Sequence, residues 1–320
     1  MNSKNPFEPK ADLFELTTRP EPNLFYKSND PHDKKLGDVV AHSYEDYEDS
    51  RFVILGCPQD EGVRRNNGRV GAAEAPDRIR EAFYKISAPA NLKAGQLFDT
   101  GNIQTGPTLE ETHENQTRVV AQIISHGKIA IVLGGGNDIA YPDGKGLGQN
   151  HKKFLTLNID SHFDVRENKQ RNSGTPYRQL LEEKIISPEN FFELASQPFA
   201  NSEVYADYLK KKQVAVIPLE QLRKKGVEKS IKGILKLSKA PAIFWGIDMD
   251  SVRSADAPGV SASNPTGLTA EEILSIAAIA GNDKRSRILE ISEVNPKYDI
   301  DGRTCKLAAL IITNFLKAQS

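Results

Sequence analysis

The chain has 320 residues, of which 38 % are hydrophobic and 27 % are charged, and its formal net charge is -1. Because this balance provides no net positive field to release counterions, it argues against a nucleic-acid-binding protein. No apolar run approaches the ~18 residues of a membrane span, and the polar N-terminus lacks the apolar segment of a signal peptide. Two cysteines, Cys57 and Cys305, are too few for a disulfide framework. We therefore expect a cytoplasmic protein that does not bind membranes.

Residues 1–50 are polar and rich in proline and acidic residues, with scattered aromatic side chains. This composition predicts an N-terminal extension that lies over a core and is partly disordered at its start. The composition shows no further break, so residues 51–320 are expected to form a single domain.

Short apolar runs alternate with amphipathic segments from residue 51 onward. The runs cover residues 52–56, 129–134, 154–159, 214–217, 242–247 and 287–292. They are almost continuously apolar, which is typical of parallel strands covered on both faces. The amphipathic segments predict helices at residues 76–86, 118–127, 269–281 and 305–318. This alternation predicts an α/β fold with a mostly parallel sheet.

Two of the predicted helices carry end signals in the sequence. Thr269 and Glu272 have the spacing of a capping box at a helix start. Gly127 and Gly281 stand where a glycine commonly ends a helix.

Polar and acidic residues follow four of the predicted strands. They are Asn137 and Asp138, the D-S-H-F-D stretch at 160–164, the D-M-D stretch at 248–250, and the E-V-N-P stretch that begins at Glu293. The carboxyl ends of parallel strands meet at one edge of the sheet, where ligands bind. These side chains are therefore expected to converge.

Alternation places the charged groups on one side of each stretch. In an extended chain, Asp160, His162 and Asp164 share a side, as do Asp248 and Asp250. Buried carboxylates need a cation or must take up protons. Oxygen and imidazole ligands without a thiolate favour Mn²⁺ or a similar divalent ion over structural zinc. A D-x-D stretch by itself is also common in turns and helix caps, so the conjunction of both stretches carries the prediction.

Five stretches, in this order, resemble the ureohydrolase (arginase/agmatinase) superfamily: GGGND, NIDSHFDVR, GIDMD, APGVSASNPTGLTAEE and EVNP. The resemblance runs from about residue 51 to the C-terminus. The stretches at residues 56–83 and 172–181 are most similar to the formimidoylglutamase branch.

The resemblance implies a three-layer α/β/α fold and a homo-oligomer, with residues 51–320 as the catalytic domain. It also implies Mn²⁺-dependent hydrolysis of a C–N bond at an amidine or guanidine carbon. For the formimidoylglutamase branch, the expected substrate is N-formimidoyl-L-glutamate, which gives L-glutamate and formamide. One metal ion would be held by Asn137, Asp160, Asp164 and Asp248, and the other by Asp160, His162, Asp248 and Asp250.

The same resemblance suggests roles around the substrate. Asp164 would relay a proton to the departing nitrogen, and Glu293 would face the cationic amidinium group. Because guanidinium groups pair with carboxylates, the candidates for the substrate carboxylates are Arg64, Arg65 and Arg69, with Ser173 and Thr175 as further donors. A surface role for any single arginine is the alternative.

Asn137 departs from the family pattern, which has histidine at this position. An amide oxygen is a neutral and weaker donor than imidazole toward Mn²⁺. The sequence therefore predicts one well-held ion and one weakened site, with Asp138 bracing the turn. Two alternatives stay open: a hydrolase of another amidine or guanidine with an impaired metal site, or a non-catalytic relative kept for binding. The retained His162 and Glu293 favour an enzyme.

Overall fold

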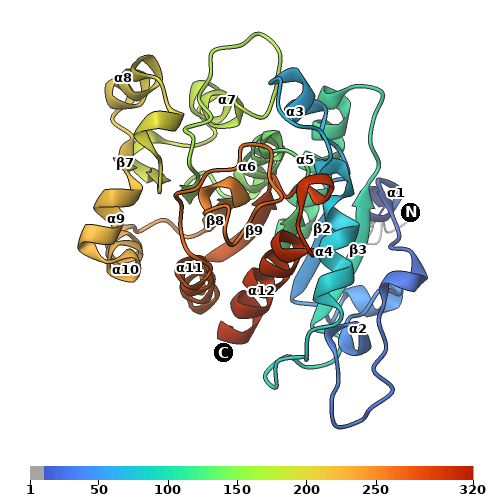
Figure 1. Cartoon of the computed structure of the whole chain (residues 1–320). Helices are drawn as coiled ribbons and strands as arrows, with labels where there is room; N and C mark the ends of the chain where they lie inside the picture. The colour runs from blue at the N-terminus through green and yellow to red at the C-terminus, as the bar shows by residue number, and fades with distance from the viewer. Residues whose placement is uncertain (1–10, 320) are drawn as a thin grey trace, which may run out of the picture.

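The computed structural model describes residues 11–319, which fold around one nine-stranded sheet (Figure 1). The strand order is β1-β3-β2-β4-β9-β8-β5-β6-β7, and every pair is parallel except β1 with β3. The strands are β1 Thr17–Thr18, β2 Phe52–Gly56, β3 Leu97–Ile103, β4 Ile129–Leu133, β5 Leu155–Ile159, β6 Phe191–Leu194, β7 Ala215–Ile217, β8 Ile243–Asp248 and β9 Ser286–Ser292. The mostly parallel sheet and the six predicted strands are confirmed.

Helices cover both faces of the sheet and complete a three-layer α/β/α fold (Figure 1). One face packs against α2 Leu36–Val39, α4 Ala75–Phe83, α9 Leu219–Lys225, α10 Val227–Leu237, α11 Ala270–Asn282 and α12 Arg303–Ala318. The other packs against α1 Ala11–Glu15, α5 Leu109–Ser125, α6 Ala140–Asn150, α7 Pro176–Glu182 and α8 Glu203–Lys212. The short α3, Glu61–Arg65, follows β2. Within residues 11–319, no helix is both long and apolar enough to cross a membrane.

The apolar strands follow from these two layers of helices. Along β2, Ile54 packs into one core, whereas Val53 and Leu55 pack into the other. Each side chain of a central strand therefore meets an apolar layer, whichever way it points. This explains why the strands are continuously apolar rather than alternating.

Three observed strands lack an apolar run long enough to be predicted. β1 and β6 are short, and β3 carries Asp99 and Asn102 among its apolar residues. Asp99 can be buried there because Arg80, itself fully buried, pairs with it through two hydrogen bonds of 2.8 and 3.0 Å. A long-range ion pair of this kind leaves no local pattern in the sequence.

The N-terminal extension contributes to the core. Its strand β1 pairs antiparallel with β3, and Leu13, Leu36 and Tyr47 are buried. The extension thus lies over the core, as predicted, and it also adds a strand to the sheet. The start of the extension, predicted to be disordered, falls in residues 1–10, outside the described residues.

The helix ends agree only in part with their sequence signals. Helix α5 begins before residue 118 because the Thr108 hydroxyl caps it by accepting from the Glu111 N–H. Gly127 follows the helix with φ 73°, as predicted. Gly281 instead lies inside α11, and an added Cβ there would be 2.2 Å from the Phe315 carbonyl oxygen of α12. This glycine serves close packing of two helices rather than a helix end.

Thr269→Ala is expected to lower the free energy of unfolding by about 1 kcal/mol. The threonine hydroxyl accepts from the Glu272 N–H at 3.1 Å, and the Glu272 carboxylate accepts from the Thr269 N–H at 2.8 Å, so alanine removes half of the capping box. Urea unfolding followed by circular dichroism would measure the loss. Thr269→Ser keeps the hydroxyl and is the matched control. Equal unfolding midpoints for T269A and T269S would contradict the assignment.

Candidate metal centre

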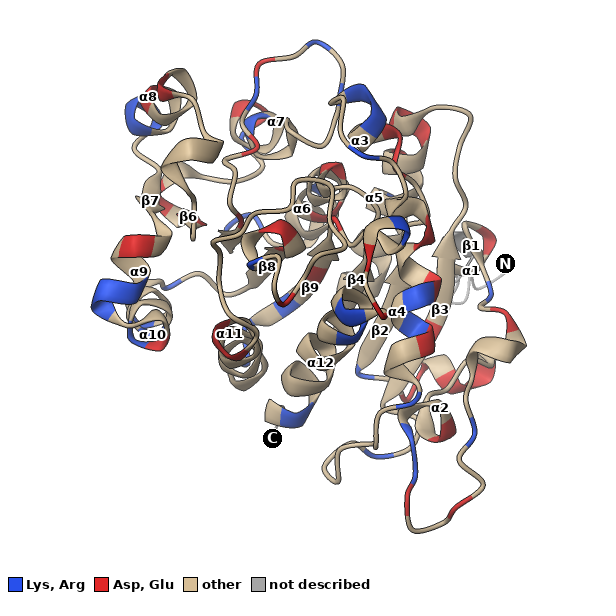
Figure 2. Ribbon diagram, in the orientation of Figure 1, with Lys and Arg blue, Asp and Glu red and all other residues tan. Residues whose placement is uncertain are grey.

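The polar and acidic segments meet at the carboxyl ends of four adjacent strands. In the sheet these strands lie in the order β4-β9-β8-β5, although they are far apart in sequence. Figure 2 shows acidic residues (red) where β8 ends, in the middle of the fold, as well as on the outer helices. The predicted convergence at one sheet edge is confirmed.

Residues 134–136 form a glycine turn between β4 and Asn137, and this turn packs against the loop that follows β2. An added Cβ at Gly135 would be 1.9 Å from the Gln59 carbonyl oxygen, so only glycine fits. Beyond the turn, the Asp138 carboxylate accepts from Gln59 Nε2 at 2.7 Å and lies 2.7 Å from His113 Nε2. These contacts agree with the bracing role predicted for Asp138, because they fix the turn that presents Asn137.

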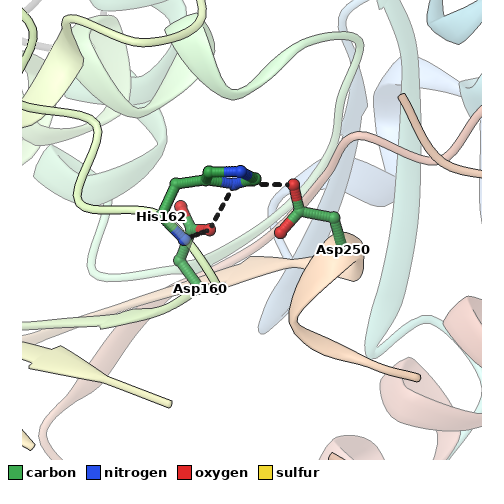
Figure 3. Close-up of side chains that lie close together, drawn as sticks. All are labelled: Asp160, His162 and Asp250. Carbon is green, nitrogen blue, oxygen red and sulfur yellow. Dashed lines mark hydrogen bonds and ion pairs between the residues drawn. The ribbon is translucent and has the colours of Figure 1, made fainter. Parts of the chain in front are cut away.

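Two overlapping groups of side chains could hold metal ions. The ligand atoms of Asp160, His162 and Asp250 lie within 4.8 Å of one another, as do those of Asp160, Asp164 and Asp248. His162 Nδ1 is 3.0 Å from Asp250 Oδ2 and 3.6 Å from Asp160 Oδ1 (Figure 3). Asp160 belongs to both groups, which is the arrangement expected of a carboxylate shared between two ions.

The backbone aims several of these side chains. Asp164 and Glu293 adopt φ values of 46° and 61°, in the left-handed region that residues other than glycine seldom occupy. The His162 N–H donates to Asp160 Oδ1 at 2.7 Å, and the Asp250 N–H donates to Asp248 Oδ1 at 2.8 Å. The acids are therefore oriented by their own loops.

A buried residue pair supports Asp160 from below. Asn158 Nδ2 donates to Glu193 Oε2 at 2.8 Å and to Asp160 Oδ2 at 3.4 Å. All three side chains are fully or almost fully buried. Sequence reasoning missed Glu193, since a single glutamate in a short apolar strand carries no signal of its own.

The electrostatics of the cluster call for a cation. Burial, together with the neighbouring carboxylates, raises the pKa of Asp160 and Asp248 well above the ordinary range. Burial also raises the pKa of Asp164 to about 6. Asp250 raises the pKa of His162, which is the one basic group within the cluster. Asp250 Oδ1 is buried with no hydrogen-bond partner. Oxygen-rich ligands, excess negative charge and an orphaned oxygen fit divalent metal ions.

Asn137 lies against the group formed by Asp160, Asp164 and Asp248. Its Nδ2 donates to Asp164 Oδ2 at 2.7 Å and to Asp160 Oδ2 at 3.2 Å. Its Oδ1 accepts from the Ser292 hydroxyl at 2.8 Å. Asn137 thus faces the acids with its amide nitrogen rather than with its oxygen.

A pocket of about 270 Å³ opens above these groups. Of the predicted site residues, its lining includes Arg69, His162, Asp164, Ser173, Asp248, Asp250 and Glu293. The buried Asn137 and Asp160 lie beneath it.

Three predicted substrate ligands do not line this pocket. Arg64 pairs with Glu61, and Arg65 pairs with Glu61 and Glu110. The Thr175 hydroxyl is buried and donates to a backbone carbonyl oxygen. A residue with no predicted role, Arg166, lines the pocket instead. Its place two residues after Asp164, in the same motif, was the available signal.

Comparison with known proteins identifies the family of this chain. The model of the arginase family matches residues 50–317. The chain belongs to the arginase family. A formimidoylglutamase of Staphylococcus aureus (strain bovine RF122 / ET3-1) is 36 % identical over 314 residues, which cover 93 % of this chain and 98 % of that protein.

Two solved structures of formimidoylglutamases are similar to this chain over most of its length. Trypanosoma cruzi formiminoglutamase, solved with Mn²⁺, has a TM-score of 0.83 and 33 % identity, and covers 88 % of this chain and 97 % of that chain. Bacillus subtilis formimidoylglutamase has a TM-score of 0.85 and 28 % identity, and covers 92 % of this chain and 94 % of that chain. These similarities support the formimidoylglutamase branch of the family.

Gly135→Ala is expected to weaken Mn²⁺ binding, because the new methyl group must push the turn that carries Asn137 away from Gln59. Gly233→Ala is the matched control: it lies in α10 with no atom within 4 Å of an added Cβ, and alanine there is expected to stabilise the fold by about 0.5–1 kcal/mol. Isothermal titration with Mn²⁺ and thermal unfolding would compare the two variants. Unchanged Mn²⁺ affinity in G135A would show that the turn does not depend on this glycine.

Proposed function

We propose that this protein is a manganese-dependent hydrolase of an amidine C–N bond. Its proposed substrate is N-formimidoyl-L-glutamate, which yields L-glutamate and formamide. The observation that carries the proposal is a largely buried cluster of aspartates with one histidine, in which two groups share Asp160, next to a pocket lined by Arg69 and Arg166. The names of the similar proteins support the same reaction.

The chain's own residues fit a pair of Mn²⁺ ions. Asp160, Asp164 and Asp248, with position 137, would hold one ion, and Asp160, His162, Asp248 and Asp250 would hold the other. When bound, such a pair supplies a water acidified enough to act as a nucleophile at neutral pH.

Two acids at the pocket have proposed roles in moving and balancing charge. Asp164 lines the pocket next to Asn137, and its proposed role is to accept a proton and pass it to the departing nitrogen. Glu293 lines the pocket and keeps Oε2 without a hydrogen-bond partner. Because burial penalises an unpaired carboxylate, Glu293 would gain from facing a cationic amidinium group.

Asn137 is proposed to weaken one of the two ion sites. Its amide is neutral, and its nitrogen rather than its oxygen points toward Asp160 and Asp164. A cation entering this group has to displace two hydrogen bonds before it gains one neutral ligand.

The proposed substrate has two carboxylates, and two arginines line the pocket. Arg69 donates from Nε to the Ser261 carbonyl oxygen, and its guanidinium also reaches the Val260 carbonyl oxygen. Among residues 11–319, neither Arg69 nor Arg166 forms an ion pair with an acid. Their positive charges are free to pair with substrate carboxylates, and Ser173 lies beside them in the lining. We also propose a cytoplasmic location and a homo-oligomeric assembly.

After loading with excess Mn²⁺ and desalting, elemental analysis is expected to find about one tightly held ion per chain, with a second lost from the site at Asn137. Asn137→His is expected to retain both ions and to tighten the weaker site at least about tenfold, or about 1.4 kcal/mol. His162→Ala is expected to release the tightly held ion. Two ions retained by the wild type would contradict the weakened site, and none would contradict the metal-dependent reaction.

Arg166→Ala and Arg69→Ala are each expected to raise KM for N-formimidoyl-L-glutamate by at least about tenfold, since each removes a charged hydrogen bond of about 1.5–3 kcal/mol. Hydrolysis of formamidine, which has no carboxylate, is expected to change little. Arg78→Ala is the control, because this exposed arginine pairs with Glu81 and lies outside the pocket lining. Equal losses on both substrates would assign the arginines to the reaction centre rather than to carboxylate binding.

A further inference from the structure

The Asn137 amide stands between two carboxylates that repel one another. Its Nδ2 reaches Asp164 Oδ2 at 2.7 Å and Asp160 Oδ2 at 3.2 Å, so one amide group donates to both. These hydrogen bonds supply partial positive charge where the buried Asp160 meets the half-buried Asp164. The amide nitrogen therefore does part of what a cation would do there.

Metal ligation by Asn137 needs its oxygen, which lies on the other side. Oδ1 accepts from the Ser292 hydroxyl at 2.8 Å. A half turn about the Cβ–Cγ bond exchanges the oxygen and the nitrogen of a planar amide. After such a turn the oxygen faces the acids, and the nitrogen faces Ser292.

Ser292 can serve both orientations. A hydroxyl donates one hydrogen bond and accepts others, so it can donate to the amide oxygen or accept from the amide nitrogen. The side chain is fully buried at the end of β9, where Ser292 pairs with Asp248 of β8. An apolar residue there would leave the inner end of the amide without a partner in either orientation.

The backbone of Asn137 stays in place while its amide turns. The Asn137 N–H donates to Glu293 Oε1 at 2.9 Å, and the neighbouring Asp138 is held by Gln59 and His113. With the main chain tied on both sides, rotation of the side-chain amide is the available adjustment.

We propose that Ser292 is a positioning residue for Asn137: its hydroxyl supports the amide while the nitrogen faces the acids, and supports it again when the oxygen turns toward an ion. This inference rests on the proposed function, because it concerns the weaker of the two proposed ion sites. A serine at the end of β9 thereby makes asparagine usable where the family pattern has histidine.

The test is a double-mutant cycle on the metal-free full-length chain, with Mn²⁺ as the titrant and calorimetry as the readout. Ser292→Ala is expected to raise the dissociation constant of the weaker ion by about tenfold, as for partners behind a metal ligand. Asn137→Ala is expected to raise it at least as much. Ser292→Ala added to Asn137→Ala is expected to cause no further change, because no amide is left to position.

Ser286→Ala is the matched control. Ser286 is an equally buried serine on the same strand, where it hydrogen-bonds Trp245 and the Ala280 carbonyl oxygen at the opposite end. This variant is expected to lose thermal stability and keep Mn²⁺ affinity. If S292A does not fold, Ser292→Cys keeps the volume with a weaker hydrogen-bonding group, and the same cycle applies.

The outcomes separate this inference from the proposed function. Unchanged Mn²⁺ affinity in S292A, or equal effects of S292A in the wild-type and N137A backgrounds, overturns the role of Ser292 alone. A wild-type chain that binds no Mn²⁺ overturns both proposals. Coupling between Ser292 and Asn137 in a chain that does not hydrolyse N-formimidoyl-L-glutamate supports the positioning role and overturns only the proposed substrate.

Discussion

Mutual repulsion among buried carboxylates is the constraint on which this structure depends. Asp160, Asp164, Asp248 and Asp250 meet at the carboxyl ends of the central strands, beside the pocket, and the burial of Asp160, Asp248 and Asp250 makes ionised groups there costly. If no cation bound here, replacing the acids with apolar residues would remove the repulsion. Such replacement of buried charged groups is often neutral for, or increases, the stability of the fold. The four acids nevertheless lie together and are oriented by their own backbone. This arrangement indicates a bound cation that offsets their electrostatic repulsion.

The surrounding residues hold the acids in place without neutralising them. Asn158 links Asp160 to the buried Glu193, and Asn137 donates to two acids at once. Amide groups provide dipoles rather than full charges, so the cluster stays negative and open to a cation. His162 is the one basic partner in the cluster, and its proton is the group that an entering metal ion would displace.

The central part of the fold and of the site could be predicted from the sequence. Strands β2, β4, β5, β8 and β9 are apolar on both faces because helices cover both, and their ends place the acids at one edge. The spacing points to Asp160, His162 and Asp164, but a turn rather than an extended chain brings them together, since Asp164 has φ 46° and the His162 N–H donates to Asp160 Oδ1. The position of the candidate metal centre can therefore be predicted mostly from the central strands.

Long-range contacts could not be predicted. Arg64 and Arg65 lie in the expected segment, but it forms helix α3. There Arg64 pairs with Glu61 and Arg65 pairs with Glu110, outside the pocket lining. The motif places Arg166 near Asp164, but its entry into the pocket lining depends on Gly174, whose missing Cβ leaves room for the arginine side chain. Strand β3 was hidden because an ion pair between Arg80 and Asp99 makes its polar residues acceptable in the core.

The two edges of the sheet are closed in different ways. Strand β7 ends one edge with only three residues, too few to recruit another chain. At the other end, β3 has seven residues, and its outer side pairs with the two residues of β1 at Asn102 and Ile103 and with Ala41 at Phe98. The N-terminal extension thus acts as a guard against intermolecular strand pairing: a chain shortened past Ala41 would expose the outer side of β3 and become prone to aggregation, even with the acidic cluster intact.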